Sequence, residues 1–222
     1  MHQTLIQRYE NGCLMLMEQK GEEFHFLGTA FIIHERGYLL TAAHLLHDVD
    51  HPVVVNAGQP GQFSPLSTET GTSLPVRVAQ IDRERGSALL ELGIDAGFGS
   101  PSDFSGNPEE IGEGTFALSI GIPFGHLRIH NVMVMNSMVA GKILSSNQTR
   151  LLLFDVPVHP GDTGGPLINT EDGRIIGLVQ GIFNPLQILQ QDAPDDYRMP
   201  SRFSYAVSIE YAKPLMDAEG LS

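Results

Sequence analysis

The chain has 222 residues, a length that suits one large domain or two small ones that share a core. Hydrophobic residues make up 41% of it and charged residues 18%, which is a globular composition and excludes a disordered chain. The 26 acidic and 13 basic side chains give a formal net charge of −13, which disfavours nucleic acid as a partner because phosphates require a basic surface.

The cysteine content and the N-terminus bear on the location of the protein. Cys13 is the only cysteine, so no intrachain disulfide can form, which fits a reducing compartment, although disulfide-free periplasmic proteins exist. The opening residues, MHQTLIQRYENG, lack the basic region and apolar core of a secretory signal. No apolar run reaches the roughly 18 residues that span a bilayer. We expect a cytoplasmic protein with no membrane contact, and a periplasmic location stays open.

Short apolar segments, separated by turns, run through the whole chain. In the first half they are residues 13–18, 24–34, 38–44, 52–56, 75–81 and 87–92. In the second half they are residues 115–120, 128–135, 138–144, 150–156, 174–183 and 203–208. The frequent Gly and Pro residues between the runs, 24 and 14 in number, are typical of an all-β sandwich or barrel.

A linker rich in Gly, Ser, Pro and acidic residues, 96–114, divides these segments into two groups of similar size. We therefore predict two similar β-barrels, residues 1–95 and 115–222, that meet along a cleft within one protein domain. Residues 56–75 and 184–202 are expected to be long surface loops. The C-terminal stretch SIEYAKPLMDAEG has a helical pattern, but Pro214 limits it to a short helix.

The residues that carry chemistry lie in two stretches, one in each half. GYLLTAAHLLHDVD presents His44 after an apolar strand, and a lone histidine there is more often structural than functional. HPGDTGGPLIN, residues 159–169, has the glycines that allow a tight turn, in which the amides of Gly161 and Thr163 point at one site. Such a pair of donors is an oxyanion hole, and a hydroxyl beside an imidazole is the nucleophile–base pair of acyl transfer. Together the two stretches indicate a hydrolytic site between the halves.

These stretches resemble the trypsin-like, chymotrypsin-fold serine proteases of the HtrA/Deg branch. The resemblance runs from about residue 24 to 217 and is carried by GTAFIIHERGYLLTAAHLLHD, ALSIGIPFG, LLLFDVPVHPGDTGGPLINTEDGRIIGLVQGIF and FSYAVSIEYAKPLM. It implies two six-stranded antiparallel barrels, with His44 as general base and residue 163 as nucleophile. It covers the protease domain only, and we expect no PDZ domain of the kind that HtrA relatives carry at the C-terminus.

The nucleophile position departs from the family pattern, because this chain has Thr163 where the family has serine. Threonine keeps the hydroxyl, but its extra methyl group restricts the first side-chain torsion and adds bulk beside the imidazole. Threonine nucleophiles usually stand at a chain N-terminus and use their own amine as base. Thr163 is internal and cannot do so, which implies impaired catalysis.

The acid of the triad is missing as well. The family places an aspartate immediately before the strand that corresponds to SALLEL, and this chain has Gly86 there. Glycine can neither orient the imidazole nor stabilise its charged form, and replacing the aspartate of a serine-protease triad by its amide lowers turnover about ten-thousandfold. Asp82 or Glu84 could take its place, although such turn charges are more often only solvated. The two departures together imply strongly impaired hydrolysis.

The resemblance also implies where a substrate side chain would bind. Pro157 stands six residues before the nucleophile, often the base of the pocket, and Gln180, Gly181 and Tyr205 would form the walls. No carboxylate stands at the base, so cleavage after Lys or Arg is not expected. A small or medium apolar side chain is the better fit.

The stretch HLLHDVDH offers a competing interpretation as a metal site. Donor atoms of suitable type come from His44, His47, Asp48, Asp50 and His51. No other cluster of His or Cys completes such a site, so a solvated loop is the favoured interpretation, and we expect neither a metal nor another cofactor.

Two functions therefore stay open. The first is a slow serine-type endopeptidase that uses His44 and Thr163. The second is a catalytically inactive pseudoprotease that holds an extended peptide along the edge of the cleft. In both, the expected partner is a peptide or an unfolded protein segment. Leu5, Ile6 and Tyr9 could build a homo-oligomer, as N-terminal segments do in HtrA trimers, or could belong to a frayed terminus.

Overall fold

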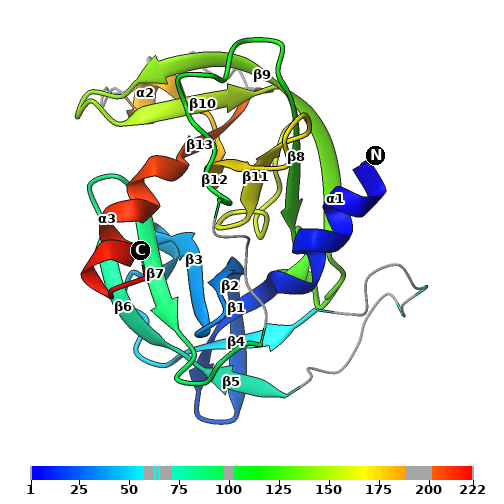
Figure 1. Cartoon of the computed structure of the whole chain (residues 1–222). Helices are drawn as coiled ribbons and strands as arrows, with labels where there is room; N and C mark the ends of the chain where they lie inside the picture. Colours follow the sequence, from blue (N-terminus) through cyan, green and yellow to red (C-terminus); the bar gives the residue numbers. More distant parts are fainter. Residues whose placement is uncertain are drawn as a thin grey trace.

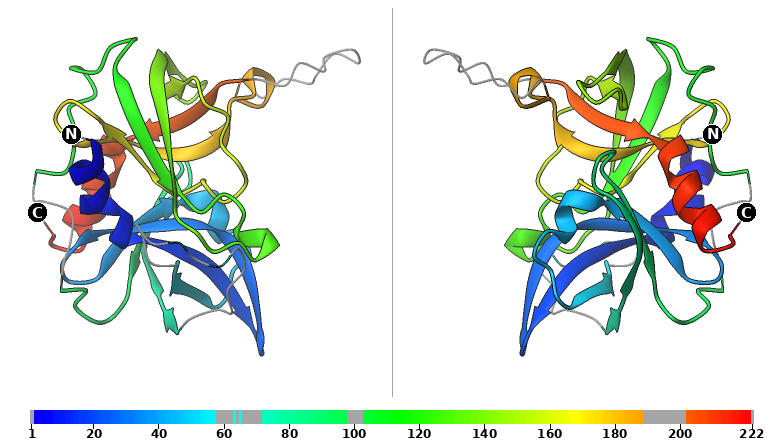
Figure 2. Two further views of the ribbon diagram at one scale, coloured as in Figure 1. Left: turned by 90° about the vertical axis from the view of Figure 1, so that its right-hand side faces the viewer. Right: turned by 90° about the vertical axis from the view of Figure 1, so that its left-hand side faces the viewer.

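The computed structural model describes residues 2–57, 63, 65, 72–97, 103–188 and 202–221. The chain folds into two antiparallel β-sheets, one built from each half of the sequence (Figure 1). Figure 2 shows the two sheets stacked one on the other, with the N-terminal half drawn in blue and cyan and the C-terminal half in green to orange. This agrees with the predicted all-β class.

The first sheet has seven strands in the order β5-β4-β1-β2-β3-β7-β6. Their bounds are β1 Cys13–Lys20, β2 Glu23–His34, β3 Tyr38–Ala42, β4 Pro52–Asn56, β5 Ser73–Pro75, β6 Arg77–Asp82 and β7 Ser87–Glu91. The strand β5 lies inside the stretch 56–75 that was predicted to be a loop, which gives this half one strand more than expected. The rest of that stretch falls largely outside the described residues.

The second sheet closes into a six-stranded barrel in the order β10-β13-β12-β11-β8-β9. Its strands are β8 Phe116–Gly121, β9 Met133–Leu144, β10 Arg150–Phe154, β11 Pro166–Asn169, β12 Ile175–Ile182 and β13 Ser204–Ser208. The predicted separate strands 128–135 and 138–144 were wrong. They are replaced by the single strand β9, because β9 pairs with β8 from Met133 to Met138 and continues without a turn to pair with β10 as far as Leu144.

Helices are short and lie at the ends of the strands. The α-helices are α1 His2–Tyr9, α2 Pro185–Ile188 and α3 Ala212–Ala218, and 3-10 turns are η1 Glu10–Gly12, η2 Ala43–Leu46, η3 Gly125–Leu127 and η4 Ile209–Tyr211. The predicted C-terminal helix is η4 followed by α3. Helix α1 was not predicted, and it is not frayed, because Tyr9 is buried and its hydroxyl donates to the Gly173 carbonyl at 2.8 Å. Helix α2 lies in the predicted loop 184–202, whose middle falls outside the described residues.

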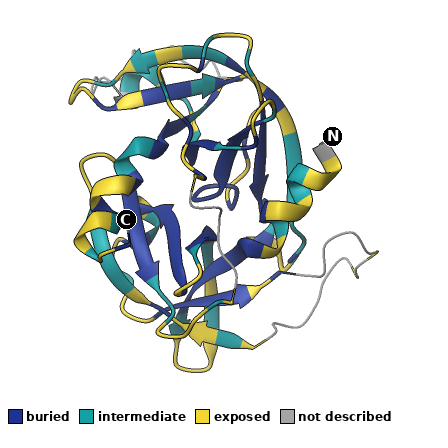
Figure 3. Cartoon of the chain, in the orientation of Figure 1, coloured by how far each residue is buried: buried dark blue, intermediate teal, exposed yellow. Residues whose placement is uncertain are grey.

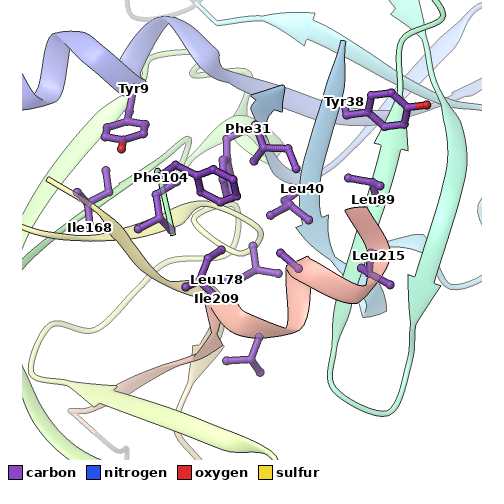
Figure 4. Close-up of a cluster of buried hydrophobic side chains, with 14 of the residues drawn as sticks. Tyr9, Phe31, Tyr38, Leu40, Leu89, Phe104, Ile168, Leu178, Ile209 and Leu215 are labelled. Carbon is purple, nitrogen blue, oxygen red and sulfur yellow. The ribbon is translucent and has the colours of Figure 1, made fainter. Parts of the chain in front are cut away.

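One hydrophobic core joins the two sheets. Phe31, Leu40 and Leu89 of the first sheet meet Leu178 of the second (Figure 4). Helix α3 follows the last strand of the barrel but packs on β6 and β7 of the first sheet, and it adds Leu215 to the same core. Figure 3 shows buried residues concentrated on the strands where the sheets face each other, and exposed residues at the hairpin tips.

The described part of the predicted linker is packed against the barrel. Phe104 is buried in the shared core, and its carbonyl accepts a hydrogen bond from the Ile175 amide at 2.7 Å. The Gly106 amide donates in turn to the Ile175 carbonyl at 2.8 Å. The connection between the sheets therefore has a fixed course along β12 over these residues.

Candidate active site

The turn between β10 and β11 carries the predicted oxyanion hole, and its backbone requires glycine at two positions. Gly161 has φ +111°, and a Cβ atom there would lie 2.3 Å from the Ile122 carbonyl oxygen. Gly164 has φ +88°, and a Cβ atom there would lie 2.0 Å from the Thr29 carbonyl oxygen. Any side chain at either position would meet both an unfavourable backbone conformation and a direct clash.

The first sheet holds this turn in place through Thr29 on β2. The Thr29 hydroxyl donates to the Gly161 carbonyl at 2.6 Å and accepts from the Ile122 amide at 3.1 Å. The Thr29 amide donates to the Thr163 carbonyl at 2.9 Å, and the Thr41 hydroxyl donates to the Thr29 carbonyl at 2.8 Å. All these groups are buried, so the turn of one sheet is fixed by the strands of the other.

Some backbone amides of the turn donate a hydrogen bond within the protein, and others do not. The Asp162 amide donates to the His159 carbonyl at 3.0 Å, and the Gly164 amide donates to the Val179 carbonyl at 2.9 Å. Within the described chain, the amides of Gly161 and Thr163 donate to no protein acceptor. These are the two donors that an oxyanion hole needs to keep available for its ligand.

Thr163 stands at the end of this turn and is 8% exposed. Its hydroxyl donates to the Gln180 carbonyl on β12 at 3.3 Å. A β-branched side chain has few torsions to choose from, so this bond and the buried surroundings fix the direction of the hydroxyl.

His44 lies on the turn η2 and not on the preceding strand, which ends at Ala42. His44 is exposed along the wall of a cavity; partial desolvation by the surrounding protein lowers the pKa of His44, and the Gln180 side chain opposes that shift. Gln180 therefore lies next to both predicted catalytic residues: its side chain lines the same cavity as His44, and its carbonyl accepts the Thr163 hydroxyl, which points to Gln180 and not to His44.

Gly86, where the family has aspartate, lies at the end of the turn before β7 with φ +80°. Its carbonyl accepts hydrogen bonds from the Ala43 amide at 3.0 Å and from the Gln180 side-chain amide at 3.1 Å. Asp82, a proposed substitute, has its carboxylate bound to Arg85, with the Arg85 amide at 2.9 Å from one oxygen and the guanidinium at 3.3 Å from the other. Glu84, the other proposed substitute, lines the same cavity as His44 but makes no contribution to the shift in the pKa of His44.

A cavity of about 650 Å³ opens beside these residues. His44, Gly86 and Gln180 line one side of it, and Tyr205 and the hairpin residues 145–149 line the other. Of the four predicted pocket residues, Gln180 and Tyr205 contribute to this wall. Pro157 and Gly181 do not.

The side chains of HLLHDVDH do not gather around one point. His47 pairs with Asp48 at 2.8 Å, and the Asp50 amide is bound by Glu18 at 3.4 Å. In the described ranges no group of three or more His, Cys, Asp or Glu residues is placed to hold a metal ion.

Two residues of the site were missed by sequence reasoning. Thr29 was quoted only as part of a family-like stretch, and its hydroxyl gives no sequence signal for the turn that it holds 132 residues away. Gln180 was predicted to be a pocket wall and not the partner of His44. The one signal for that role was the empty acid position at Gly86, which leaves room for a long side chain from elsewhere.

Comparison with known proteins bears on this geometry. Residues 28–178 match the family model described as a trypsin-like peptidase domain. A probable periplasmic serine endoprotease DegP-like from Halomonas elongata is 30% identical over 169 residues, which are 73% of this chain and 31% of that protein. Its counterpart from Ectopseudomonas mendocina is 32% identical over 162 residues, 72% of this chain and 30% of that protein. The chain thus spans about a third of the length of these relatives.

Solved structures agree in fold. The HtrA-type protease AlgW with tripeptide superposes with a TM-score of 0.71 at 21% identity, over 98% of this chain and 63% of that one. A serine endoprotease from Yersinia pestis superposes with a TM-score of 0.69 at 17% identity, over 98% of this chain and 65% of that one.

The relatives' names place those proteins in the periplasm, so the expected cytoplasmic location finds no support among them. None of the helices in the described residues has the length and apolar character to cross a bilayer. The family match, the DegP-like relatives and the shared fold lead to one conclusion: the chain belongs to the trypsin-like peptidase family and is similar to the protease domain of its HtrA/DegP-like members.

Proposed function

We propose that this protein hydrolyses peptide bonds slowly, with Thr163 as nucleophile, His44 as general base and the amides of Gly161 and Thr163 as oxyanion donors. The observation that carries the proposal is the turn itself. The hydroxyl of Thr29 holds its backbone while the two amides stay without a protein acceptor among the described residues. Two such amides are the donors that an oxyanion hole presents to a tetrahedral intermediate.

The chemistry follows the usual course of acyl transfer. Partial desolvation lowers the pKa of His44 and favours its neutral form. The Thr163 hydroxyl turns from the Gln180 carbonyl to His44, which takes its proton as Oγ1 attacks the substrate carbonyl carbon. The carbonyl oxygen becomes negative and is bound by the two free amides. The imidazolium then gives its proton to the leaving amine, the C–N bond breaks, and a water molecule hydrolyses the threonine ester by the same steps in reverse order.

Two features support a low rate. The methyl group of Thr163 restricts the approach of the hydroxyl, and a misplacement of 1 Å can cost about a hundredfold in rate. The imidazolium has a neutral carboxamide beside it in place of a carboxylate, so its positive charge is stabilised less.

The substrate in this proposal is an extended peptide or an unfolded protein segment with a small or medium apolar side chain at the cleavage site. Gly181 leaves open space where a side chain would begin, and Tyr205 pairs with it across β13. The related AlgW structure contains a tripeptide, which supports peptide binding by this fold. We also propose that residues 1–95 and 115–222 act as two halves of one protease domain and that the protein forms a homo-oligomer.

A second candidate function is a pseudoprotease that binds a peptide without cleaving it. The specific observation in its favour is that no carboxylate of the described residues contributes to the pKa of His44. Without that charge, a hydroxyl of ordinary acidity is a poor nucleophile.

The experiment compares the parent protein with Thr163→Ala, Thr163→Ser and the matched control Thr170→Ala, whose hydroxyl lies on the far side of β11 and bonds the Phe116 carbonyl. Hydrolysis of an unstructured apolar peptide and labelling by a fluorophosphonate are measured together with peptide affinity. We expect slow cleavage by the parent and the control, none by Thr163→Ala, and a gain of about tenfold to a hundredfold in Thr163→Ser. Equal cleavage by Thr163→Ala and the parent would refute the proposal. Peptide binding without cleavage or labelling would establish the pseudoprotease.

A further inference from the structure

The space left by the missing triad acid is filled from the opposite sheet. A Cβ atom on Gly86 would lie 3.0 Å from Oε1 of Gln180 and 3.4 Å from its side-chain carbonyl carbon. Gln180 comes from β12, 94 residues further along the chain, and its side chain is 6% exposed. The carboxamide therefore stands in close contact with the position where a side chain at residue 86 would begin.

The orientation of this carboxamide is fixed by two backbone carbonyls. Its nitrogen donates to the Gly86 carbonyl at 3.1 Å and to the Leu178 carbonyl at 3.4 Å. Two carbonyl acceptors on one side mean that this atom is the nitrogen, because an oxygen there would be repelled by both. Oε1 is thus left as the atom that can accept a hydrogen bond, and Gln180 lines the same cavity as His44.

We propose that Gln180 is a positioning residue that replaces the triad acid: Oε1 accepts the ring N–H of His44 and fixes its tautomer, so that the other ring nitrogen is free to take the proton of Thr163. This inference rests on the proposed function. The Gln180 carbonyl also accepts the Thr163 hydroxyl at 3.3 Å, so this hydroxyl has to leave Gln180 and turn to His44 before its proton can be transferred.

The two carbonyls explain why a carboxamide serves here when it fails in an ordinary triad. An amide in place of the aspartate can turn its NH2 group toward the histidine, which stabilises the wrong tautomer and lowers turnover about ten-thousandfold. In this chain the NH2 group is held by the Gly86 and Leu178 carbonyls and cannot turn. Gln180 thus keeps the directing role of the acid and lacks only its charge.

His44 shares its cavity with four ionisable groups of both signs. The ionisable groups that line the same cavity are His47, Arg83, Glu84 and Arg85. His47 is paired with Asp48, and Arg85 with Asp82. Burial of His44 lowers its pKa, and the Gln180 bond opposes this, which is the direction expected of an acceptor that stabilises the charged ring.

The test reads the tautomer and the pKa of His44 directly, by two-bond 1H–15N correlation spectra of histidine-labelled protein, with His44 assigned from the spectrum of His44→Asn. The variants are Gln180→Leu and Gln180→Met, which keep the volume and remove the acceptor. The matched control is Gln19→Leu, whose amide bonds only the Gly21 carbonyl in a distant hairpin. Thermal unfolding of each variant verifies that it folds, and peptide hydrolysis is measured as kcat and KM.

In the parent and the control we expect one dominant tautomer of His44. In both Gln180 variants we expect a mixture of tautomers, a lower pKa of His44, and a kcat reduced at least about tenfold at little change in KM, because positioned general-base catalysis contributes about 10²–10⁴-fold. A parent in which both tautomers are equally populated, or Gln180 variants with an unchanged tautomer and pKa, would overturn the inference. The spectra report the tautomer of His44 even if the protein does not turn over substrate. An inactive parent would therefore refute the proposed hydrolysis, while the role of Gln180 would still be tested by the spectra.

Discussion

Replacing Gly86 by alanine tests the close contact between Gly86 and Gln180. A non-glycine residue at φ +80° costs about 1–2 kcal/mol relative to glycine. The new Cβ would lie 3.0 Å from Oε1 of Gln180, so the carboxamide has to shift by a few tenths of an ångström, which misaligns its hydrogen bonds to the Gly86 and Leu178 carbonyls. Lost or misaligned buried hydrogen bonds add about 1–3 kcal/mol. The total of about 2–5 kcal/mol corresponds to a fall in Tm of roughly 4–20 °C for a chain of this size.

Gly93→Ala is the matched control for that measurement. Gly93 has φ +69°, and a Cβ atom there would meet no other atom within 4 Å. Unfolding followed by calorimetry or circular dichroism should therefore show only the backbone cost for Gly93→Ala. The free energy of unfolding of Gly86→Ala should be lower by about a further 1–3 kcal/mol. Adding Gln180→Ser to Gly86→Ala should remove much of the excess, since the two changes share one space. Equal destabilisation by the two alanine variants would show that Gln180 does not occupy the site above Gly86.

Three further predictions concern the rest of the molecule. Thr29→Val keeps the shape of the side chain but removes the donor to the Gly161 carbonyl, so it should destabilise by about 1–3 kcal/mol and lower kcat more than it changes KM. Burial raises the pKa of Asp162 above its ordinary 3.8, so the folded protein holds that proton more tightly and loses stability as pH rises through the folded pKa. Asp162→Asn should lack this loss, and its Tm relative to the parent should increase with pH; a constant difference would contradict this. Tyr9→Phe removes the bond to the Gly173 carbonyl and should cost about 1 kcal/mol in chemical unfolding, with no change in activity.

The strands could be predicted from the sequence because their signal is local. Apolar runs between Gly and Pro turns placed β1, β2, β4 and β8 within one or two residues of their observed bounds. The prediction of two strands, 128–135 and 138–144, was wrong because the polar residues Asn136 and Ser137 suggested a break between them. Pairing with β8 keeps the backbone extended through both residues. Helix α1 was missed because its stability comes from the docking of Tyr9 on the barrel and not from its own sequence.

The site could be predicted only where a motif is contiguous. The glycines of the turn follow from backbone conformation, which a short stretch records. The contact of Gln180 with Gly86 joins two strands that are 94 residues apart, and no local pattern encodes it. The same contact alters the reversion that the sequence suggests. Thr163→Ser with Gly86→Asp would place an aspartate against Gln180, so restoring a triad requires a smaller residue at position 180 as well.

The pairing of His44 with a neutral amide also determines how the loss of the acid would appear in kinetics. A carboxylate partner raises the pKa of a histidine and strengthens it as a base, whereas burial here lowers the pKa of His44 and Gln180 only partly opposes that effect. A lowered pKa favours the neutral ring, which is the form that accepts a proton. It also makes the ring a weaker base, and no carboxylate contributes to the shift in its pKa. We therefore expect the replacement of the acid by Gln180 to lower the plateau rate, and the rate to rise at a lower pH than it would with a carboxylate-paired histidine.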